Sequence, residues 1–414
     1  MQQAHTTRLI DLTRLISRIG RGPMTGIDRV ERAYADRIIA GSEPAFGLVR
    51  AAPGHALLDR DGIAGLLARF DGHVPWGPAD TLSRLHLRQP MARRRAMSDL
   101  RRLALGTTLS GRPGALSTLL RRHLPGGVTY LNVGHANLSQ DTLGALRHMP
   151  GSRIAVMLHD TIPLDHPEFA ATGMPARFAA MVAQLARHAD LVIWTTAAAR
   201  MAGEPHLAQA GRIPPGIVAH LGVPRPAGTL RDLPERLATL IASQPYFLCV
   251  GTIEPRKNIG FLVDLWEAMA RENGAGPIPT LVLAGARGWR SDALFGRLDG
   301  SPLRGHRIVE ENALSDRELG GLLAGACGLL FPSHAEGFGL PPAEAAACGV
   351  PVLCNNLPAI REVLGEYPLY AGQDAPYSWR RNILALAERK DFEKTPTADV
   401  PTWEAHFSAV FAHV

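Results

Sequence analysis

Short apolar runs alternate with longer amphipathic stretches along the whole chain. In the first half, this pattern predicts buried strands at 8–16, 126–135, 152–160 and 189–196. A glycine-bearing loop at 20–29 follows the first of these runs and leads into an amphipathic helical stretch. Strands that alternate with helices pack as parallel sheets covered on both faces. The pattern therefore predicts an α/β fold.

The same alternation restarts after residues 225–243, which are rich in proline and charge and which we interpret as a linker. Ser315 followed by Glu318 predicts a capping box at the start of a helix. We therefore expect two doubly wound sheets, one in residues 1–226 and one in residues 244–385. The strands of the second half are predicted at 246–252, 280–286, 328–333 and 350–355.

Composition is that of an ordinary globular protein, with 46% hydrophobic and 20% charged residues, and 414 residues are too many for one compact core. No charged start precedes an apolar run, so no signal peptide is expected. The most apolar stretch, Leu319–Phe331, is too short to span a bilayer. Cys249, Cys327, Cys348 and Cys354 have no Cys-x-x-Cys spacing, and we interpret them as reduced core residues of a cytoplasmic protein.

Positive charge is concentrated in one segment. The chain has a net charge of +6, but the segment from Arg84 to Arg122 holds ten arginines and one acidic residue, Asp99. This segment therefore carries +9 and the rest of the chain −3. Such a basic segment suits anionic lipid headgroups, a phosphorylated acceptor or nucleic acid. A solvated helical face is an equally good explanation of the same residues.

Two glutamates, Glu336 and Glu344, lie eight positions apart in the loop and helix that follow the strand at 328–333. Gly337 and Gly339 permit a close approach of the backbone, and a Pro-Pro pair suits the first helical turn. Free N–H groups at a helix start attract polar ligands, and two carboxylates suit a ribose or a hexose. Alternatively, Glu344 only complements the helix dipole and Glu336 is solvated.

A pair of adjacent cations follows the strand at 246–252. Arg256 and Lys257 lie in a strand-to-helix loop, where one side chain can form a fork of hydrogen bonds and the other acts as a point charge. This combination suits a diphosphate. Two exposed loop cations are the alternative, but the glutamate loop in the same half favours the functional interpretation.

Three other interpretations are less favoured. The Asp-x-Asp pattern at 59–61 mimics a metal motif, but the following Gly62 makes a hairpin turn the better prediction, so no metal site is expected. The glycines of the 20–29 loop lack the spacing of a dinucleotide fingerprint. A two-carboxylate hydrolase needs two side chains held across one sugar bond, which Glu344 at the base of a helix does not offer.

Several segments together resemble the family 4 retaining glycosyltransferases of the GT-B fold. In the N-terminal half, IAVMLHDTIPLDHPEF and ADLVIWTTAAAR are similar to segments of that family, and the similarity thins between about residues 50 and 125. The resemblance implies two Rossmann-like domains that face each other across a cleft, with residues 386–414 returning to the first domain. The C-terminal segments that carry it are VGTIEPRKN, LVLAGARGW, LSDRELGGLLAGACGLLFPS and EGFGLPPAEAAACGVPVLCNN, in this order.

The resemblance assigns residues of the second domain to a nucleotide-sugar donor. Glu344 would hold the ribose, and Glu336 would contact hydroxyls of the transferred sugar. Arg256 and Lys257 would neutralise the diphosphate. Backbone amides would lie along the sugar and phosphate at Gly337, Phe338, Gly339 and Leu340.

Two residues of the first domain are assigned in the same way. His159 matches a histidine that faces the donor sugar, and Gly26 matches the glycine nearest the donor phosphates. The chain departs from many members at Thr252, where an arginine is common after the glycine. With Thr252 at this place in the donor site, the phosphate clamp is expected to depend more on Arg256 or to recruit another arginine.

The implied activity is the retaining transfer of a sugar from a nucleotide-diphosphate sugar to a hydroxyl of a glycan or lipid-linked acceptor. It implies a place in bacterial polysaccharide or lipopolysaccharide biosynthesis, with no cofactor, metal or nucleic acid partner. The acceptor is expected on the first domain, and segment Arg84–Arg122 is expected to bind an anionic surface at the inner face of the cell membrane. A GT-B sugar-nucleotide 2-epimerase and a non-catalytic nucleotide-sugar-binding homologue are the alternatives.

Overall fold

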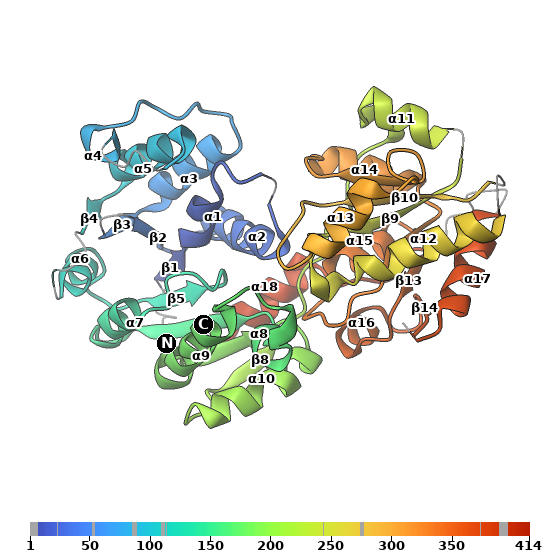
Figure 1. Ribbon diagram of the computed structural model, residues 1–414. Coiled ribbons are helices and arrows are strands. Elements are labelled where there is room, and N and C mark those ends of the chain that lie inside the picture. The colour runs from blue at the N-terminus through green and yellow to red at the C-terminus, as the bar shows by residue number, and fades with distance from the viewer. Residues whose placement is uncertain are drawn as a thin grey trace.

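Two α/β units, each built on one sheet flanked by helices, lie side by side in the computed structural model (Figure 1). The structure describes residues 7–22, 24–51, 54–84, 89–108, 112, 114–242, 244–273, 277–372, 374–388 and 396–414.

The first sheet has eight strands in the order β4-β3-β2-β1-β5-β6-β7-β8. Its strands are β1 (Arg8–Asp11), β2 (Ala45–Ala51), β3 (Gly54–Leu58), β4 (Gly106–Thr107), β5 (Thr129–Asn132), β6 (Arg153–Leu158), β7 (Leu191–Trp194) and β8 (Gly216–Val218). The helices of this unit are α1 (Thr13–Arg18), α2 (Gly26–Ala40), α3 (Arg60–Phe70), α4 (Thr81–Arg84), α5 (Met91–Leu103), α6 (Ala115–His123), α7 (Gln140–Arg147), α8 (Ile162–Asp165), the 3₁₀ helix η1 (Pro167–Phe169), α9 (Met174–His188) and α10 (Ala197–Gln209).

Three sequence predictions for this unit need correction. The run at 8–16 is the short strand β1 followed by α1, because the Asp11 carboxylate accepts a hydrogen bond from the Thr13 N–H (3.0 Å) and turns the chain. Asp59 caps α3 and accepts a hydrogen bond from the Gly62 N–H (2.8 Å), so this stretch is a helix start and not a hairpin turn. The sheet is mixed, because β3 and β4 run antiparallel to their neighbours.

The second sheet is wholly parallel, with six strands in the order β11-β10-β9-β12-β13-β14. Its strands are β9 (Tyr246–Val250), β10 (Thr280–Ala284), β11 (Ile308–Glu311), β12 (Gly328–Phe331), β13 (Val352–Cys354) and β14 (Leu369–Tyr370). The helices of the remaining chain are η2 (Leu230–Asp232), α11 (Glu235–Ala242), η3 (Pro255–Lys257), α12 (Ile259–Asn273), α13 (Asp292–Gly300), α14 (Asp316–Gly325), α15 (Leu340–Ala347), α16 (Pro358–Leu364), α17 (Pro376–Ala387) and α18 (Trp403–Phe411).

The strand order places two loops of the second unit next to each other. The chain winds from β9 outward to β11 and then returns to the other side of β9 with β12. Ligands of such sheets bind outside the carboxyl ends of the strands at the point where the winding direction reverses. The loops after β9 and β12 leave the sheet at this point, and they carry the predicted cations and the first predicted glutamate. The predicted capping box at Ser315 and Glu318 is present at the start of α14.

The end of the chain packs against the first unit. Figure 1 shows α18, in red, beside the strands and helices of the N-terminal half. The Tyr34 hydroxyl of α2 lies 2.8 Å from Nε2 of His406, and the Tyr34 ring meets the Phe407 ring at 5.0 Å. The segment that we interpreted as a linker contains η2 and α11, and α11 buries Leu237.

The four cysteines are free thiols. Burial raises the pKa of Cys249 and of Cys354 to about 12, so both thiols are protonated at neutral pH. Across the described part of the chain, no helix is both long and apolar enough to cross a bilayer.

Candidate active site

The loops after β9 and β12 bring Arg256, Lys257 and Glu336 together. After β9, Gly251 adopts a φ of 137°, a value that favours glycine. A Cβ at this position would lie 3.2 Å from Cε of Lys257. Glycine therefore lets the main chain turn directly over the lysine side chain, which is buried.

One carboxylate oxygen holds both cations. Oε1 of Glu336 lies 2.6 Å from Nη1 of Arg256 and 2.7 Å from Nζ of Lys257. Arg256 also pairs with Glu254, whose Oε1 lies 2.8 Å from Nη2. The ammonium group of Lys257 lies 4.5 Å from the centroid of the Phe331 ring. The lysine is thus held between a carboxylate and an aromatic face.

The charges of this cluster depend on one another. Burial acts to raise the pKa of Glu336, but Arg256 and Lys257 outweigh it and hold that pKa below its ordinary value. Burial lowers the pKa of Lys257, and Glu336 counteracts this effect. Burial likewise opposes the charge of Arg256, but Glu336, Glu254 and Asp160 together raise the pKa of Arg256. The carboxylates therefore favour the charged form of both cations, against the effect of burial.

Glu344 meets a residue of the first unit. It lies in the second turn of α15, one turn later than the sequence predicted, and it is buried. Nη2 of Arg29, in α2, lies 2.6 Å from Oε1 of Glu344. Burial raises the pKa of Glu344, and Arg29 acts in the opposite direction. This ion pair joins the two units at the residue that was predicted to hold a ribose.

His159 follows β6 and is buried, and its backbone lies against the loop that carries Gly337. Its Nε2 lies 2.8 Å from the Val133 carbonyl oxygen, so Nε2 carries the proton and donates it. Burial lowers the pKa of His159 to about 4, so the ring is neutral at neutral pH. Its own carbonyl oxygen accepts a hydrogen bond from the Thr195 hydroxyl (3.0 Å).

The backbone of Gly337 lies directly against the first unit. A Cβ on Gly337 would lie 2.3 Å from the His159 carbonyl oxygen and 2.9 Å from Cβ of Asp160. The Gly337 carbonyl oxygen accepts hydrogen bonds from the hydroxyls of Thr195 (3.2 Å) and Thr196 (2.9 Å). Only a residue without a side chain permits this approach.

The remaining predicted residues lie around this contact. Gly26 begins α2, and a Cβ there would lie 3.3 Å from Cδ1 of Leu340, so these two meet across the units. Gly339 caps α15 with a φ of 88°. The Phe338 side chain is buried in the core, which leaves only its backbone to face a ligand. Thr252 is half-buried and directs its methyl group toward Gly288.

Three further contacts between charged and polar groups were not found from the sequence. Arg29 and Glu362 lie far along the chain from their partners, whereas Glu254 pairs with Arg256, two residues away. Glu362 accepts hydrogen bonds from the Ala197 N–H (2.7 Å) and the Ala198 N–H (2.9 Å), at the N-terminus of α10. Arg29 could have been noted, because it lies three residues after Gly26 and so on the same face of α2. Within the described ranges, no group of three or more His, Cys, Asp or Glu side chains could hold a metal ion.

Substitution of Gly337 by alanine is expected to separate the two units. The added methyl group would lie 2.3 Å from backbone oxygen, and backbone cannot move aside as the end of a flexible side chain can. Small-angle X-ray scattering should show a larger radius of gyration for Gly337→Ala than for the wild type. Gly296→Ala, in α13 with no neighbour within 4 Å, is the matched control and should leave it unchanged. An unchanged radius for Gly337→Ala would show that this contact does not hold the units together.

Substitution of Glu336 by glutamine is expected to destabilise the protein by about 3 kcal/mol at pH 7, because it leaves two buried cations short of a counter-charge. Without Glu336, burial lowers the pKa of Lys257 further, so the native state binds fewer protons than the unfolded state. The free-energy cost of burying charged Lys257 is fully present at low pH. It decreases as the pH rises toward the pKa of lysine in the unfolded state, about 10.4. Urea unfolding should therefore give a smaller difference from wild type at pH 9.5 than at pH 7. An equal difference at both pH values would contradict this account of Lys257.

Residues 244–389 match the family described as glycosyl transferases group 1. Serotype-specific mannosyltransferase WbdA of Escherichia coli is 29% identical over 267 residues, which are 61% of this chain and 32% of that protein. O-antigen chain mannosyltransferase B of Escherichia coli is 34% identical over 173 residues, which are 42% of this chain and 45% of that protein. The chain thus spans about a third to a half of the length of these relatives.

The solved structure of HepE from Anabaena, in complex with UDP and glucose, has a TM-score of 0.57 with 18% identity, and the match covers 95% of this chain and 92% of that one. Sucrose-phosphate synthase from Thermosynechococcus elongatus has a TM-score of 0.56 with 17% identity, and the match covers 92% and 91%. Both matches extend over both units. The chain therefore has the GT-B fold, and its second unit is similar to the group 1 glycosyltransferases.

Proposed function

We propose that this protein is a retaining glycosyltransferase that moves mannose from a nucleotide-diphosphate sugar to a hydroxyl group of a glycan acceptor in the assembly of a bacterial surface polysaccharide. The observation that carries the proposal is the buried cluster of Arg256, Lys257 and Glu336 beside α15, at the edge of the sheet where such folds bind nucleotides. The matched family and the two named mannosyltransferases support the reaction and the sugar.

In this proposal the donor lies along the loop from Glu336 to α15. The diphosphate binds Arg256 and Lys257, which are already charged and already fixed by their neighbours. The ribose hydroxyls bind Glu344, and the backbone of Gly337 to Leu340 lies between the two ends. Glu336 offers its carboxylate to hydroxyls of the sugar.

The reaction follows from where charge develops. Departure of the nucleoside diphosphate builds negative charge on its phosphate and positive charge on the anomeric carbon. Preorganised cations at the leaving group supply the largest stabilisation, so no metal is needed in this scheme. The leaving phosphate takes the proton of the acceptor hydroxyl on the same face of the sugar, which retains configuration without an enzymic nucleophile. Neutral His159, whose Nε2–H donates a hydrogen bond to the Val133 carbonyl oxygen, can accept a hydrogen bond from a sugar hydroxyl at Nδ1.

Thermal-shift titration with GDP, UDP and ADP tests the donor site, since a ligand that binds only the native state raises the apparent melting temperature. The nucleotide that stabilises the protein should then serve, as its mannose derivative, in a transfer assay with a glycan acceptor. Release of an epimerised sugar without an acceptor would favour the epimerase alternative. Absence of stabilisation by all three nucleotides would contradict a nucleotide-sugar site.

Lys257→Ala is expected to reduce the transfer rate by about 10²–10³-fold, because it removes a cation from the leaving group. Circular dichroism should show the same secondary structure as for the wild type. Arg271→Ala, which removes an exposed cation at the end of α12, is the matched control and should transfer at the normal rate. Normal turnover by Lys257→Ala would show that the phosphate contact lies elsewhere.

A further inference from the structure

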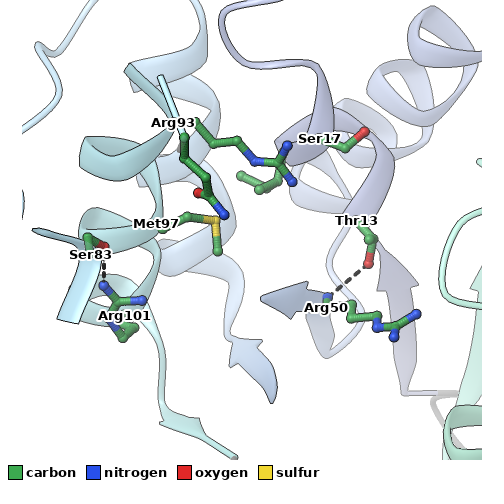
Figure 2. Close-up of a pocket in the computed structure, with 9 residues that line it drawn as sticks. Thr13, Ser17, Arg50, Ser83, Arg93, Met97 and Arg101 are labelled. Atoms are coloured by element: carbon green, nitrogen blue, oxygen red, sulfur yellow. Dashed lines mark hydrogen bonds between the residues drawn. The ribbon is translucent and has the colours of Figure 1, made fainter. Parts of the chain in front are cut away.

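A small cavity lies in the first unit, away from the cation–glutamate cluster. It is formed between α1 and α5, beside the strand β2, and Figure 2 shows the side chains that enclose it. They are Thr13, Ile16, Ser17, Arg50, Ser83, Gln89, Arg93, Met97 and Arg101. Three of these nine residues are arginines and none is acidic.

The size of the cavity restricts what it can hold. Its volume is about 60 Å³. A site for one water molecule needs about 10–15 Å³ by this measure, so the cavity has room for roughly four to six atoms of that size. One phosphate group fits this space, whereas a sugar ring with its hydroxyls does not.

The arginines of the cavity differ in their partners. Arg101 forms an ion pair with Asp80 (2.7 Å) and donates to the Ser83 hydroxyl, so it is a fixed part of the wall. Within the part of the chain that the structure describes, the guanidinium groups of Arg50 and Arg93 form no hydrogen bond or ion pair. Nε of Arg93 is buried and without an acceptor. A buried donor of this kind costs free energy until an acceptor binds it.

The hydroxyl groups around the cavity can also donate. The Thr13 hydroxyl oxygen accepts a hydrogen bond from the Arg50 N–H (2.9 Å), which leaves its proton for another acceptor. The Ser83 oxygen accepts from Arg101 in the same way. Figure 2 shows Arg93 extending into the space between α5 and α1, with Thr13 on the opposite side, whereas the guanidinium group of the exposed Arg50 extends away from Arg93. Burial and the nearby charge of Arg21 lower the pKa of Arg93, as expected where positive charge is not balanced.

The cavity is connected to the candidate active site through one loop. A Cβ on Gly20 would lie 3.8 Å from Cβ of Ala92, so the start of this loop contacts α5. The loop ends at Gly26, which meets Leu340 of the other unit. A phosphate in the cavity would therefore lie in the first unit, which is expected to bind the acceptor, beside the loop that leads to the candidate active site.

We infer that this cavity binds a phosphate group of the acceptor, held by Arg93 and the hydroxyls of Thr13 and Ser83 with the exposed Arg50 at its rim, an assignment that rests on the proposed function. Arginine binds phosphate through paired N–H donors, and Arg93 has a buried donor without an acceptor. The acceptor is then a phosphorylated glycan. Its phosphate belongs either to a lipid diphosphate or to a free sugar phosphate, which present the same group to the cavity.

Arg93→Gln and Arg50→Gln test the cavity, with Arg95→Gln, an exposed arginine of the same helix as Arg93, as the matched control. Thermal shifts are measured with inorganic phosphate and pyrophosphate at low ionic strength. Phosphate also suits the donor site, so the comparison between variants is the readout. The shift should be smaller in the two cavity variants and unchanged in Arg95→Gln.

Transfer kinetics identify the source of the phosphate. Two acceptors are compared: a short prenyl-diphosphate-linked sugar in phosphatidylcholine vesicles and a soluble sugar phosphate. For the true acceptor, KM should be about tenfold or more higher in Arg93→Gln than in the wild type. The KM for the donor should not change. The acceptor that shows this dependence is the one whose phosphate the cavity holds.

Two results would overturn the inference. One is an equal phosphate shift in wild type and both cavity variants. The other is an equal loss of the phosphate-induced thermal shift in Arg95→Gln, which would indicate binding to general positive charge. Co-sedimentation with phosphatidylglycerol vesicles that is weakened equally in all three variants would indicate the same. Stabilisation by nucleotides distinguishes failure of the cavity assignment from failure of the proposed function. If nucleotides stabilise the protein but Arg93→Gln changes neither the phosphate shift nor the KM of the acceptor, only the cavity assignment is refuted. Failure to bind any nucleotide refutes the proposed function instead.

Discussion

Burial of two cations beside a single carboxylate oxygen is the interaction on which the candidate site depends. Glu336 lies within 2.7 Å of both Arg256 and Lys257 and so favours their charged forms. In the proposed function a diphosphate binds these two cations, beside the carboxylates of Glu336 and Glu254 that already pair with them. The strand order makes this arrangement possible, since β9 and β12 are neighbours in the sheet and distant in the sequence.

The candidate site is assembled from both halves of the chain. Arg29 reaches Glu344 from α2, and the Thr196 hydroxyl donates to the Gly337 carbonyl oxygen from the start of α10. Two of the residues proposed to hold the donor, Glu344 and Gly337, are thus also residues that contact the other unit. A donor that binds Glu344 has to share or replace Arg29, so donor binding and the arrangement of the two units are coupled.

Features that depend on neighbouring residues were predicted from the sequence, whereas contacts between residues far apart in the chain were missed. Alternating strands and helices, the capping box at Ser315 and the two polar loops follow from residues close together in the chain. The end of β1 was missed because an apolar run does not reveal that the Asp11 carboxylate turns the chain. The pairing of Arg29 with Glu344 is set by tertiary packing, which no local pattern records. The basic segment was predicted as one charged surface, but Arg101 is paired internally and Arg93 lines a cavity.

A crystal structure with the stabilising nucleoside diphosphate bound tests the central claim most directly. The account predicts diphosphate oxygens within hydrogen-bonding distance of the Lys257 ammonium and the Arg256 guanidinium groups, with the ribose hydroxyls on Glu344. A nucleotide bound elsewhere, with both cations still paired only to Glu336 and Glu254, would contradict it.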